Sequence, residues 1–590
     1  MRNIFSASSG ELNPIIIVRY ALFLLLLIGL TFFYISPGFR GLNHEKGLEQ
    51  AQIAREIARG NGFQSKVIRP LSLHQSLEHN ENITLAGFHD TYHAPLNPLV
   101  NSIALNFAKE DYEWDRKKTV YPLDRVIAGV SIFFLLCSVA MTYLLITGIF
   151  DAKIGGITAL LMLLCEMLWQ FSQSGLPQML MLFLFTCVSY FSFKALKSEI
   201  NGRKPLLWLS LCSVFFGLLA LAHWIAVWPF VGWLIFTALY FKPRGVAAVL
   251  MLLIFLAIVS PWAIRNAQIT GTPLGSGYYS VLGGMSVEEE YIFRSYEPPG
   301  RNIFDDGFYT KIINTSIDQL NGIYAFLGSI AVAPLFFLSL LHPFKRRTIA
   351  DFRWCILAMW LFAVMGMSLF GLPEKTSDAN QLHMLFIPLM TAYGLAFLSI
   401  LWSRLGFSSN IPLVINGHLV LAIFFSSIPM ILGFIPNIRR SFSERNMNTL
   451  ALQISYIREE VAPAGIVVSD DPWRVSWYGD TLSLWLPATP RQMNKIQHLT
   501  TQNGQPLTGI LITRESSQKS LLEMTYGKER DWAPLIAGQT IAFAGWREKQ
   551  AKNWTQAGQM MLNSMNNMEF TKLNIAMTSR GFFYLVNPKE

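Results

Sequence analysis

Two glutamates lie four residues apart in a short polar segment of the chain, residues 44–60. If this segment is helical, Glu45 and Glu49 share one face of the helix, and Ile53 and Ile57 continue the same spacing. A carboxylate held in such a helix can accept a proton from a hydroxyl group. The same spacing also fits an ordinary interfacial helix whose carboxylates face water.

Basic and histidine side chains follow in the same polar stretch. Lys66 and Arg69 bring positive charge near the glutamates, and the sequence His-Asp-Thr-Tyr-His-Ala-Pro occupies residues 89–95. The spacing of His89 and His93 suits a metal site on a helix. The residues between them and the proline that follows argue against a regular helix, so we predict that both histidines line a cavity or bond within the loop.

A further basic motif, Ser-Pro-Trp-Ala-Ile-Arg-Asn, ends a long apolar run at residues 260–266. Its arginine, Arg265, can extend towards lipid headgroups and simply anchor the chain. It can also make charge-assisted hydrogen bonds to a phosphate. Both interpretations fit the motif.

The elements that must position these residues are mostly apolar. Hydrophobic residues make up 52% of the 590 residues and charged residues only 14%. Runs of roughly twenty apolar residues recur, each long enough to cross a hydrocarbon core about 30 Å thick, which predicts an integral membrane protein. The net charge of +9 lies mainly in short loops between these runs, so no nucleic-acid partner is predicted. All five cysteines fall inside the runs, which excludes a disulfide framework or thiolate zinc site in the polar parts.

About eleven spans are predicted. The first, about residues 15–35, has no cleavage site after it and is interpreted as a signal anchor with a cytoplasmic N-terminus. Residues 206–241 are predicted to form a hairpin near His223 and Trp224, because one long helix would place basic loops on both sides of the membrane. The other runs are 124–148, 154–173, 177–196, 246–264, 321–341, 351–371, 381–402 and 412–435.

Two large loops, 36–123 and 265–320, and the C-terminal region are predicted to share the outer side. This divides the chain into a transmembrane domain, 1–438, and a soluble extracytoplasmic α/β domain, 439–590. Strands are predicted at 465–470, 483–486, 508–513 and 582–586, with helices around 449–460, 490–500 and 515–526.

The order of these motifs resembles the GT-C class of polytopic glycosyltransferases. The acidic helix after the first run is followed by His-Ala-Pro-Leu-Asn-Pro-Leu at 93–99, the Arg-Asn motif with Gly-Thr-Pro-Leu at 271–274, and Val-Ser-Asp-Asp-Pro-Trp at 468–473. The chain looks most like bacterial protein-mannosyltransferases and lipid A aminoarabinose transferases. The resemblance covers about residues 15–435 in architecture, and the first loop and the Arg-Asn motif in detail.

The resemblance implies inverting transfer of a sugar from a polyprenyl-phosphate donor to a glycan, lipid or protein acceptor, outside a bacterial inner membrane. It places the general base on Glu49 or, in second place, Glu45, although many members have Asp there. Arg265, Arg69 and Lys66 are implied to hold the departing phosphate, whose growing charge needs fixed cations. No cofactor besides the lipid-linked donor is implied, no metal ligand is assigned, and a divalent metal is left open.

Other polar residues are predicted to line the substrate cavity: His44, His89, His93, Asp124, His223 and His383. Asp124 can equally form a local ion pair with Arg125, and the hairpin tip at His223 can be an interfacial anchor. The C-terminal aromatic residues either stack on sugars or pack against the membrane domain; they are Trp473, Trp477, Tyr478 and Trp485.

Two other functions fit parts of the sequence. A lipid or glycan transporter needs polar or discontinuous segments at mid-bilayer, and apart from Glu166 and a few Ser and Thr these spans are poor in such groups. A non-catalytic subunit of a complex that assembles cell-envelope glycans would keep full sugar transfer after Glu49→Gln.

Overall fold

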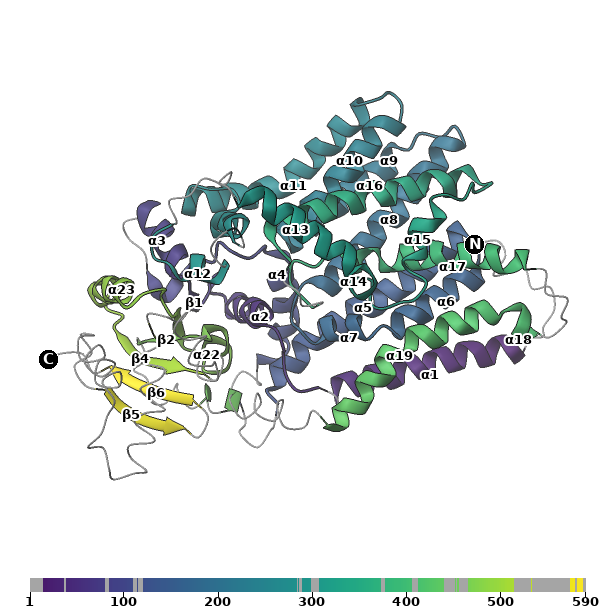
Figure 1. Cartoon of the computed structure of the whole chain (residues 1–590). Helices are drawn as coiled ribbons and strands as arrows, with labels where there is room; N and C mark the ends of the chain where they lie inside the picture. The colour runs from purple at the N-terminus through teal and green to yellow at the C-terminus, as the bar shows by residue number, and fades with distance from the viewer. Residues whose placement is uncertain are drawn as a thin grey trace.

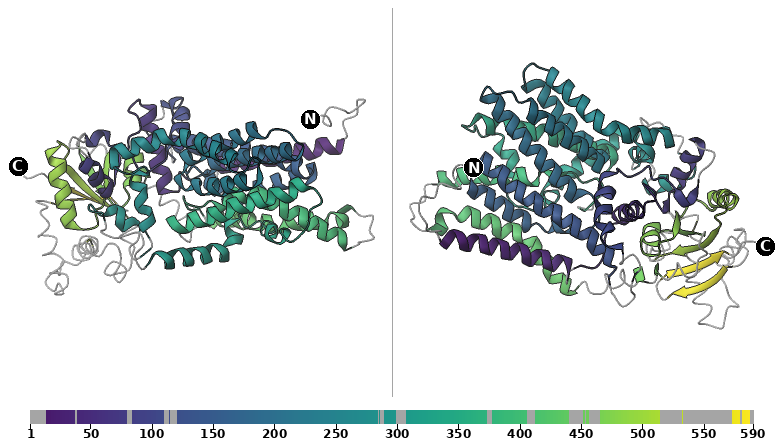
Figure 2. Two further views of the ribbon diagram at one scale, coloured as in Figure 1. Left: turned by 90° about the horizontal axis from the view of Figure 1, so that it is seen from above. Right: turned by 180° about the vertical axis from the view of Figure 1, so that it is seen from behind.

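A helical bundle and a smaller part built around a sheet lie end to end (Figure 1). Turned views show the same elongated arrangement (Figure 2). The computed structural model describes residues 14–36, 39–79, 84–109, 114, 120–283, 285, 289–298, 307–372, 377–405, 412–439, 451–452, 454–455, 465–513, 532, 573–578 and 581–586.

The bundle is a multi-pass membrane domain. Five of its helical stretches are long and apolar enough to cross a membrane: α5 (Pro122–Ile149), α8 (Gln178–Ile200), α11 (Val246–Thr270), α16 (Arg347–Phe370) and residues 383–404, which end in α17 (Ile387–Arg404). A sixth span results if α6 (Ala152–Leu163) and α7 (Glu166–Ser172), which meet at 58°, are taken together. Shorter apolar helices lie within α1 (Pro14–Ile35), α9 (Leu206–Ala222), residues 224–240 with α10 (Val227–Tyr240), and α19 (Gly417–Arg439). The membrane class is confirmed, whereas the number of eleven spans is not.

Apolar side chains point outward from the bundle as well as inward. On α11, Val246, Val249 and Leu253 are 62%, 59% and 57% exposed. The interior is filled by large buried side chains such as Trp169 and Trp233. Exposing such an apolar helix surface to acyl chains costs little free energy, whereas exposing it to water is unfavourable.

The predicted hairpin at residues 206–241 is confirmed. His223 leaves the helical conformation, with φ −157° and ψ 125°, between α9 and α10. Phe216 and Trp233, on either side of it, have ring centroids 5.3 Å apart. In one continuous helix these rings would be about 25 Å apart, so the chain turns back at His223.

The run 321–341, predicted to be one span, is a broken segment. It contains only α14 (Ile323–Phe326) and α15 (Leu335–Ser339), after α13 (Phe308–Asn321). Gly328 and Ser329 have φ of 71° and 54° between the two short helices. A right-handed helix cannot continue through two left-handed residues, which explains the error.

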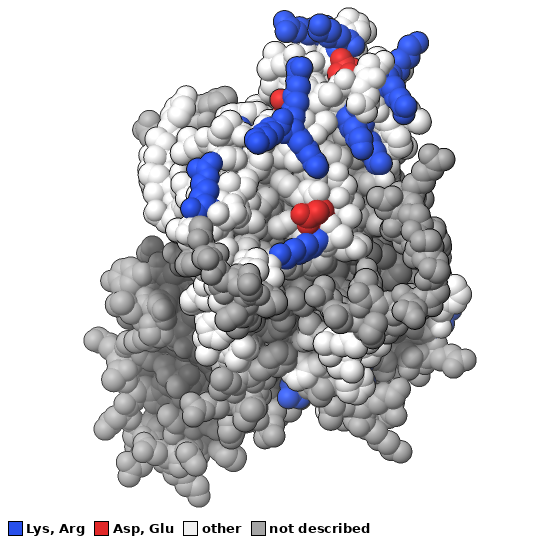
Figure 3. Space-filling model, turned by 90° about the vertical axis from the view of Figure 1, so that its right-hand side faces the viewer, with Lys and Arg blue, Asp and Glu red and all other residues white. Residues whose placement is uncertain are grey.

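Basic side chains gather at the end of the bundle that lies away from the sheet (Figure 3). The α8–α9, α10–α11 and α15–α16 connections carry exposed Arg203, Lys204, Lys242, Arg244, Lys345 and Arg346, and α16 begins with exposed Arg347. Few acidic side chains lie among them in this view. Such an excess is typical of the cytoplasmic side of membrane proteins.

The sheet has the strand order β1-β3-β2-β4-β6-β5, parallel through its first four strands and antiparallel at β6 and β5. The predicted strands are present as β2 (Ile466–Ser469), β3 (Leu482–Trp485), β4 (Leu507–Ile512) and β6 (Gly581–Val586). The helix expected at 490–500 is α23 (Pro490–Gln502), while residues 515–526 and most of 449–460 lie outside the described residues. Sequence reasoning missed α22 (Pro472–Tyr478), β5 (Leu573–Thr578) and β1 (Val67–Ile68).

Strand β1 belongs to the first large loop, between α1 and α5, so that loop contributes to the C-terminal sheet: Val67 pairs with Ser483, and Ile68 with Leu484. The same loop forms α2 (Glu45–Ala58), α3 (Pro70–His79) and α4 (Leu96–Asn106), and α12 (Glu289–Arg294) comes from the second large loop. Helix α2 lies between the bundle and the sheet (Figure 1).

Candidate functional site

Glu49 is a fully buried carboxylate on α2. Its Oε1 and Oε2 accept hydrogen bonds from Nη1 and Nη2 of Arg69, each at 2.5 Å. Oε2 also accepts from Trp473 Nε1 at 3.1 Å, and His93 Nε2 lies 3.0 Å from it. The carboxylate is therefore held by groups from three separate parts of the chain.

A second buried carboxylate lies beside this pair. Asp90 accepts a hydrogen bond from the backbone N–H of His93 at 2.8 Å, and its Oδ1 lies 3.9 Å from Arg69 Nη1. The guanidinium carbon of Arg69 lies 4.1 Å from the centre of the Tyr92 ring, a cation–π distance. We call Glu49, Arg69, Asp90 and His93 the Glu49 site.

The two carboxylates of the Glu49 site differ in proton affinity. Burial alone would raise the pKa of Glu49, but the Arg69 guanidinium and then His93 outweigh burial and lower that pKa from 4.5 to about 2. Burial raises the pKa of Asp90 above its usual range, and the charge of Glu49 adds to the rise although His93 opposes it. One carboxylate is thus strongly held as the anion, whereas burial makes its neighbour a weaker acid than a free aspartate.

Close backbone packing fixes α2 against the bundle. A Cβ on Gly47 would lie 1.9 Å from the carbonyl oxygen of Ser174, so only glycine fits there. Gln50 lies about one turn after Gly47 on α2. Its Oε1 accepts a hydrogen bond from Asn97 Nδ2 at 2.7 Å, and the same Nδ2 donates to the carbonyl of Gly175 at 3.2 Å. The helix begins at its N-cap residue, His44, whose ring accepts from the Lys46 N–H at 3.2 Å. These contacts set the height of Glu49 relative to the bundle.

A small cavity of about 50 Å³ adjoins the Glu49 site. Its wall combines the first large loop, the α9–α10 hairpin tip, the segment after α11 and the segment at the end of α16: Lys46, Gln50, Tyr92, His93, Ala94, Ala222, His223, Trp224, Ile225, Gly277, Ser280, Phe370, Ala379 and Asn380. Lys46 Nζ lies 3.7 Å from Glu289 Oε1 at this wall. Sequence reasoning anticipated His93 and His223 but passed over Lys46, although it lies between the two candidate glutamates.

Lys66 lies in a separate ionic cluster. Its Nζ is 2.6 Å from Asp480 Oδ1 and 3.4 Å from Glu56 Oε1. Arg59 binds Asp480 through both terminal nitrogens, at 2.9 and 2.8 Å, and Arg55 Nη2 lies 3.1 Å from it. We call Asp480, Glu56, Arg55, Arg59 and Lys66 the Asp480 hub. Lys66 was expected beside the donor phosphate, but here its charge joins the first loop to the C-terminal region.

Arg265, near the C-terminal end of α11, donates hydrogen bonds to the backbone of the first loop. Its Nη1 donates to the carbonyl of Asp90 at 2.9 Å, and Nη2 to that of Phe63 at 3.4 Å. The guanidinium also stacks 4.4 Å from the Trp262 ring centre. Arg265 is half-buried immediately behind the Glu49 site.

The remaining predicted cavity residues are dispersed. His89 is exposed at an isolated bridge with Gln64. Asp124 accepts from Trp477 Nε1 at 2.7 Å and from the Tyr478 hydroxyl at 3.0 Å, so these aromatic residues pack on the bundle.

Within the bundle, His383 is buried. Its ring nitrogens lie 3.1 Å from Trp360 Nε1 and from Gln319 Oε1.

Glu45, the second candidate base, lies one turn before Glu49 and is half-buried. The structure thus brings Glu49, Arg69 and His93 together.

The ligand types for a divalent metal are present in the Glu49 site, because oxygens of Glu49 and Asp90 and a nitrogen of His93 lie within 4.8 Å of one another. However, Arg69 occupies both oxygens of Glu49 and approaches Asp90. In this arrangement the guanidinium supplies the positive charge that a metal would supply.

No protein-family model and no curated protein sequence matches the chain. The fold is similar to that of ArnT from Cupriavidus metallidurans bound to undecaprenyl phosphate, with a TM-score of 0.53 and 10% identity over 97% of this chain and 99% of that one.

It is also similar to an Archaeoglobus fulgidus oligosaccharyltransferase, solved with Zn and sulfate (TM-score 0.51, 12% identity, 87% and 70% of the two chains). The fold is similar, too, to that of AglB from Archaeoglobus fulgidus in complex with an inhibitory peptide and a dolichol-phosphate. That match has a TM-score of 0.51 and 11% identity, over 87% of this chain and 72% of that one. The chain therefore has the GT-C fold of membrane glycosyltransferases, and the resemblance predicted from its motifs is confirmed at the level of fold.

Proposed function

We propose that this chain is an inverting glycosyltransferase that moves a sugar from a polyprenyl-phosphate donor to an acceptor on the outer face of the membrane. One observation carries the proposal: a buried, ionised carboxylate, Glu49, adjoins a cavity at the membrane boundary, in a fold shared with enzymes solved with undecaprenyl phosphate and dolichol-phosphate. The basic opposite end supports a cytoplasmic location for that end, which puts Glu49 outside.

The reaction assigned to this site is a single displacement. The acceptor hydroxyl oxygen attacks the anomeric carbon, the bond from that carbon to the phosphate oxygen breaks, and Glu49 takes the hydroxyl proton. Polyprenyl phosphate leaves with the bonding electrons. His93 and Trp473 keep the carboxylate oriented through their contacts with Oε2.

Arg69 gives the site a way to activate its base. A carboxylate with a pKa of about 2 is a weak base, and the Arg69 ion pair is the main favourable contribution to that low value. A donor phosphate competes for the same guanidinium, since arginine binds phosphate and carboxylate with the same paired geometry. When Arg69 turns to the phosphate, burial dominates and the pKa of Glu49 rises towards the range useful for catalysis.

Two more cations complete the proposed donor site. Arg265 donates a hydrogen bond to the backbone carbonyl of Asp90, and Lys46 lies on the cavity wall. Fixed positive charge placed where the leaving phosphate gains its charge lowers the barrier more than the same charge in water. Lys66 is left out of this proposal because the Asp480 hub engages its ammonium group.

The test is direct. Purified full-length protein is incubated with a panel of labelled polyprenyl-phosphate sugars and a membrane glycolipid extract, and release of polyprenyl phosphate is scored. We expect release with at least one donor and loss of release in Glu49→Gln.

Two matched variants separate the alternatives. Glu45→Gln should keep transfer if Glu49 is the base, and Glu56→Gln removes a buried carboxylate of the same helix outside the site. If Glu49→Gln folds and transfers sugar at the wild-type rate, another residue is the base. If the wild-type protein releases polyprenyl phosphate from no donor in the panel, the non-catalytic subunit is favoured.

A further inference from the structure

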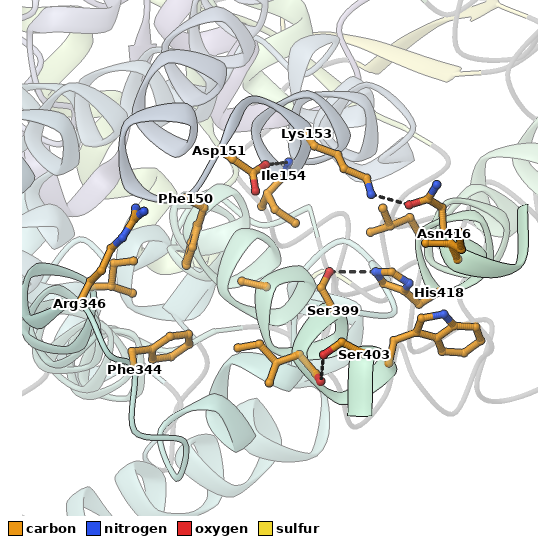
Figure 4. A pocket seen from close by; sticks show the side chains of 16 residues that line it. Phe150, Asp151, Lys153, Ile154, Phe344, Arg346, Ser399, Ser403, Asn416 and His418 are labelled. Carbon is orange, nitrogen blue, oxygen red and sulfur yellow. Dashed lines mark hydrogen bonds between the residues drawn. The ribbon is translucent and has the colours of Figure 1, made fainter. Parts of the chain in front are cut away.

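Two cavities of the molecule differ in whether the polar groups of their walls already bond to each other. The larger, about 560 Å³, lies at the basic end of the bundle (Figure 4). In its wall Lys153 donates to Asn416. Ser399 Oγ there lies 2.9 Å from His418 Nε2. The cavity of about 50 Å³ beside the Glu49 site instead has accessible polar atoms without a hydrogen bond among the described residues, so it is the better candidate for a ligand group.

Gln50 presents a hydrogen-bond donor at the small cavity. Its side chain is only 4% exposed and lines the cavity, and its Oε1 accepts from Asn97 Nδ2. This assignment is fixed, because Asn97 Nδ2 also donates to the backbone carbonyl of Gly175, which can only accept. Gln50 Nε2 therefore lies on the other side of its amide, where it is accessible and bonds to no described residue. A buried amide nitrogen in this state indicates a ligand that accepts a hydrogen bond.

His223 presents a second donor at the same cavity. Its Nδ1 accepts from the backbone N–H of Ile225 at 3.3 Å, which leaves the ring proton on Nε2. Burial and, after it, the charge of Lys46 lower the pKa of His223 to about 3, so the ring is neutral at neutral pH. His223 lines the cavity, and its Nε2 is accessible and bonds to no described residue. The hairpin tip thus offers one uncharged N–H group.

Asn380 presents the complementary group, an acceptor. Its Nδ2 donates to the backbone carbonyl of Gly371 at 3.0 Å, which turns Oδ1 the other way. Asn380 is 8% exposed and lines the cavity, and its Oδ1 is accessible and bonds to no described residue. A carboxylate or phosphate is disfavoured beside this oxygen, because neither has a hydrogen to donate when ionised. The ligand group must therefore both accept and donate.

The volume and the rest of the wall restrict the group further. A cavity needs roughly 10–15 Å³ to hold one water, so about 50 Å³ holds a few non-hydrogen atoms and not a sugar ring. Apolar side chains complete the wall: Ala94, Ala222, Ile225 and Phe370. An acetamido group has this size, with a carbonyl that accepts, an N–H that donates and a methyl group that suits the apolar wall. A hydroxyl group would leave the apolar wall uncovered.

The cavity lies next to the reacting centre. His93 lines it and lies 3.0 Å from the Glu49 carboxylate, and Gln50 follows Glu49 in α2. The part of a donor sugar closest to its anomeric carbon is the substituent on carbon 2. We propose that the cavity receives the 2-acetamido group of the donor sugar, with Gln50 and His223 donating to its carbonyl oxygen and Asn380 accepting from its N–H. This inference rests on the proposed function and names its substrate class.

The test uses polyprenyl-phosphate donors with a glucose or a galactose ring that bears an acetamido, an amino or a hydroxyl group on carbon 2. Release of polyprenyl phosphate by the full-length protein, with the glycolipid extract as acceptor, gives kcat/KM. Native mass spectrometry in detergent gives donor binding without acceptor. We expect kcat/KM to be about 100-fold higher for an acetamido donor than for its hydroxyl analogue, because a site built to hydrogen-bond a group rejects analogues that leave its polar groups unpaired.

The outcomes separate this inference from the proposed function. Equal kcat/KM for acetamido and hydroxyl donors would overturn the acetamido site and leave sugar transfer standing. Preferential binding of an acetamido donor without release from any donor would support the site and contradict transfer. If no donor is bound or released, both proposals fail.

Two variants connect the preference to the cavity. The side chain introduced by His223→Asn keeps an acceptor for the Ile225 N–H, as asparagine does at N-caps, but ends short of Nε2. Gln50→Glu keeps the oxygen that Asn97 binds and replaces the nitrogen at the cavity by an acceptor. Each should lower the ratio of kcat/KM between acetamido and hydroxyl donors about tenfold, the effect of one hydrogen bond.

This ratio distinguishes recognition from folding, since a general loss of packing would lower kcat/KM for both donors and leave their ratio unchanged. His89→Asn changes an exposed histidine that does not line the cavity; it is the matched control and should keep the wild-type ratio. A wild-type ratio in each cavity variant that folds would overturn the acetamido site.

Discussion

Helix α2 carries two ionic clusters that are similar in composition and different in setting. The Glu49 site pairs two carboxylates with one guanidinium and one imidazole, and His93 also lines the adjoining 50 Å³ cavity. The Asp480 hub pairs two carboxylates with three cations, and none of its members lines that cavity. Excess positive charge anchors the hub, whereas the Glu49 site keeps an excess of carboxylate beside open space.

The two clusters also differ in how many cations control the proton affinity of the central carboxylate. Burial would raise the pKa of Asp480, but Arg55, Arg59 and Lys66 together hold that pKa well below its usual range. Releasing one cation leaves Asp480 two others. Glu49 depends mainly on Arg69, so a single competing anion is enough to change its proton affinity.

The largest effect expected is the loss of turnover in Glu49→Gln. General-base catalysis contributes about 10²–10⁴ in rate, and the amide cannot take the proton. The variant should also lose stability, because buried Arg69 loses its paired carboxylate and, among the described residues, keeps only the more distant Asp90 carboxylate, at 3.9 Å. The measurement is kcat per folded molecule, with folding checked by gel filtration. If kcat of Glu49→Gln falls by less than tenfold, Glu49 is not the general base.

Next in size is the effect of Asp480→Asn on stability. Three cations would lose their shared anion, and we expect the free energy of unfolding to fall by about 3 kcal/mol, the low end for buried pairs because the side chains of Arg59 and Lys66 are 25% and 21% exposed. Thermal unfolding in detergent measures this. The control, Glu297→Gln, breaks the exposed pair with Lys495 and should leave the melting temperature unchanged. A tenfold loss of transfer per folded Asp480→Asn molecule would contradict a purely anchoring hub.

A smaller effect is predicted for Trp473→Phe. It removes the indole hydrogen bond to Glu49 Oε2 while the ring is kept, and hydrogen bonds to charged groups contribute about 1.5–3 kcal/mol. We expect kcat/KM to fall about tenfold or somewhat more. Trp485→Phe, whose ring packs 4.9 Å from that of Trp473, is the control for packing alone. Equal losses in the two variants would mean that the hydrogen bond has no catalytic part.

The subtlest test is the pH dependence of kcat/KM. In the wild type the pKa of Glu49, about 2, keeps the base ionised throughout the neutral and mildly acidic range, so Glu49 should give no acid limb there. In Arg69→Gln the main lowering influence is lost and burial raises this pKa, so an acid limb should appear at higher pH. The same sign holds for stability: the ion pair stabilises the fold above pH 4.5 and this contribution is lost as the pH falls towards 2. An unchanged profile in Arg69→Gln would break the proposed link between Arg69 and Glu49.

Much of the bundle and the position of Glu49 could be predicted because the signals are local. Apolar runs become helices in a membrane since every backbone polar group must be satisfied within the segment. The spacing of Glu45 and Glu49 predicted one helical face, and the run Ile466–Ser469 predicted a buried strand. In these segments the nearest neighbours in sequence decide the structure.

The missed features depend on distant parts of the chain or on single backbone angles. Two residues, Val67 and Ile68, become a strand only because β3 offers an edge, which no local pattern reveals. The break in the run 321–341 rests on the left-handed φ angles of two residues, Gly328 and Ser329, in a run that is otherwise apolar enough for a span. Trp473 was noted as a possible sugar contact, but its bond to Glu49 requires the folded C-terminal region.

The 424-residue separation between Glu49 and Trp473 has a consequence for biogenesis. At a synthesis rate of about 5–20 residues per second, roughly 20–85 s pass between translation of the one and of the other. During that interval the first loop has neither its sheet partner nor its indole donor. The nascent chain would therefore reach the membrane with the Glu49 site incomplete, and its assembly would end with completion of that site rather than with insertion of the last helix.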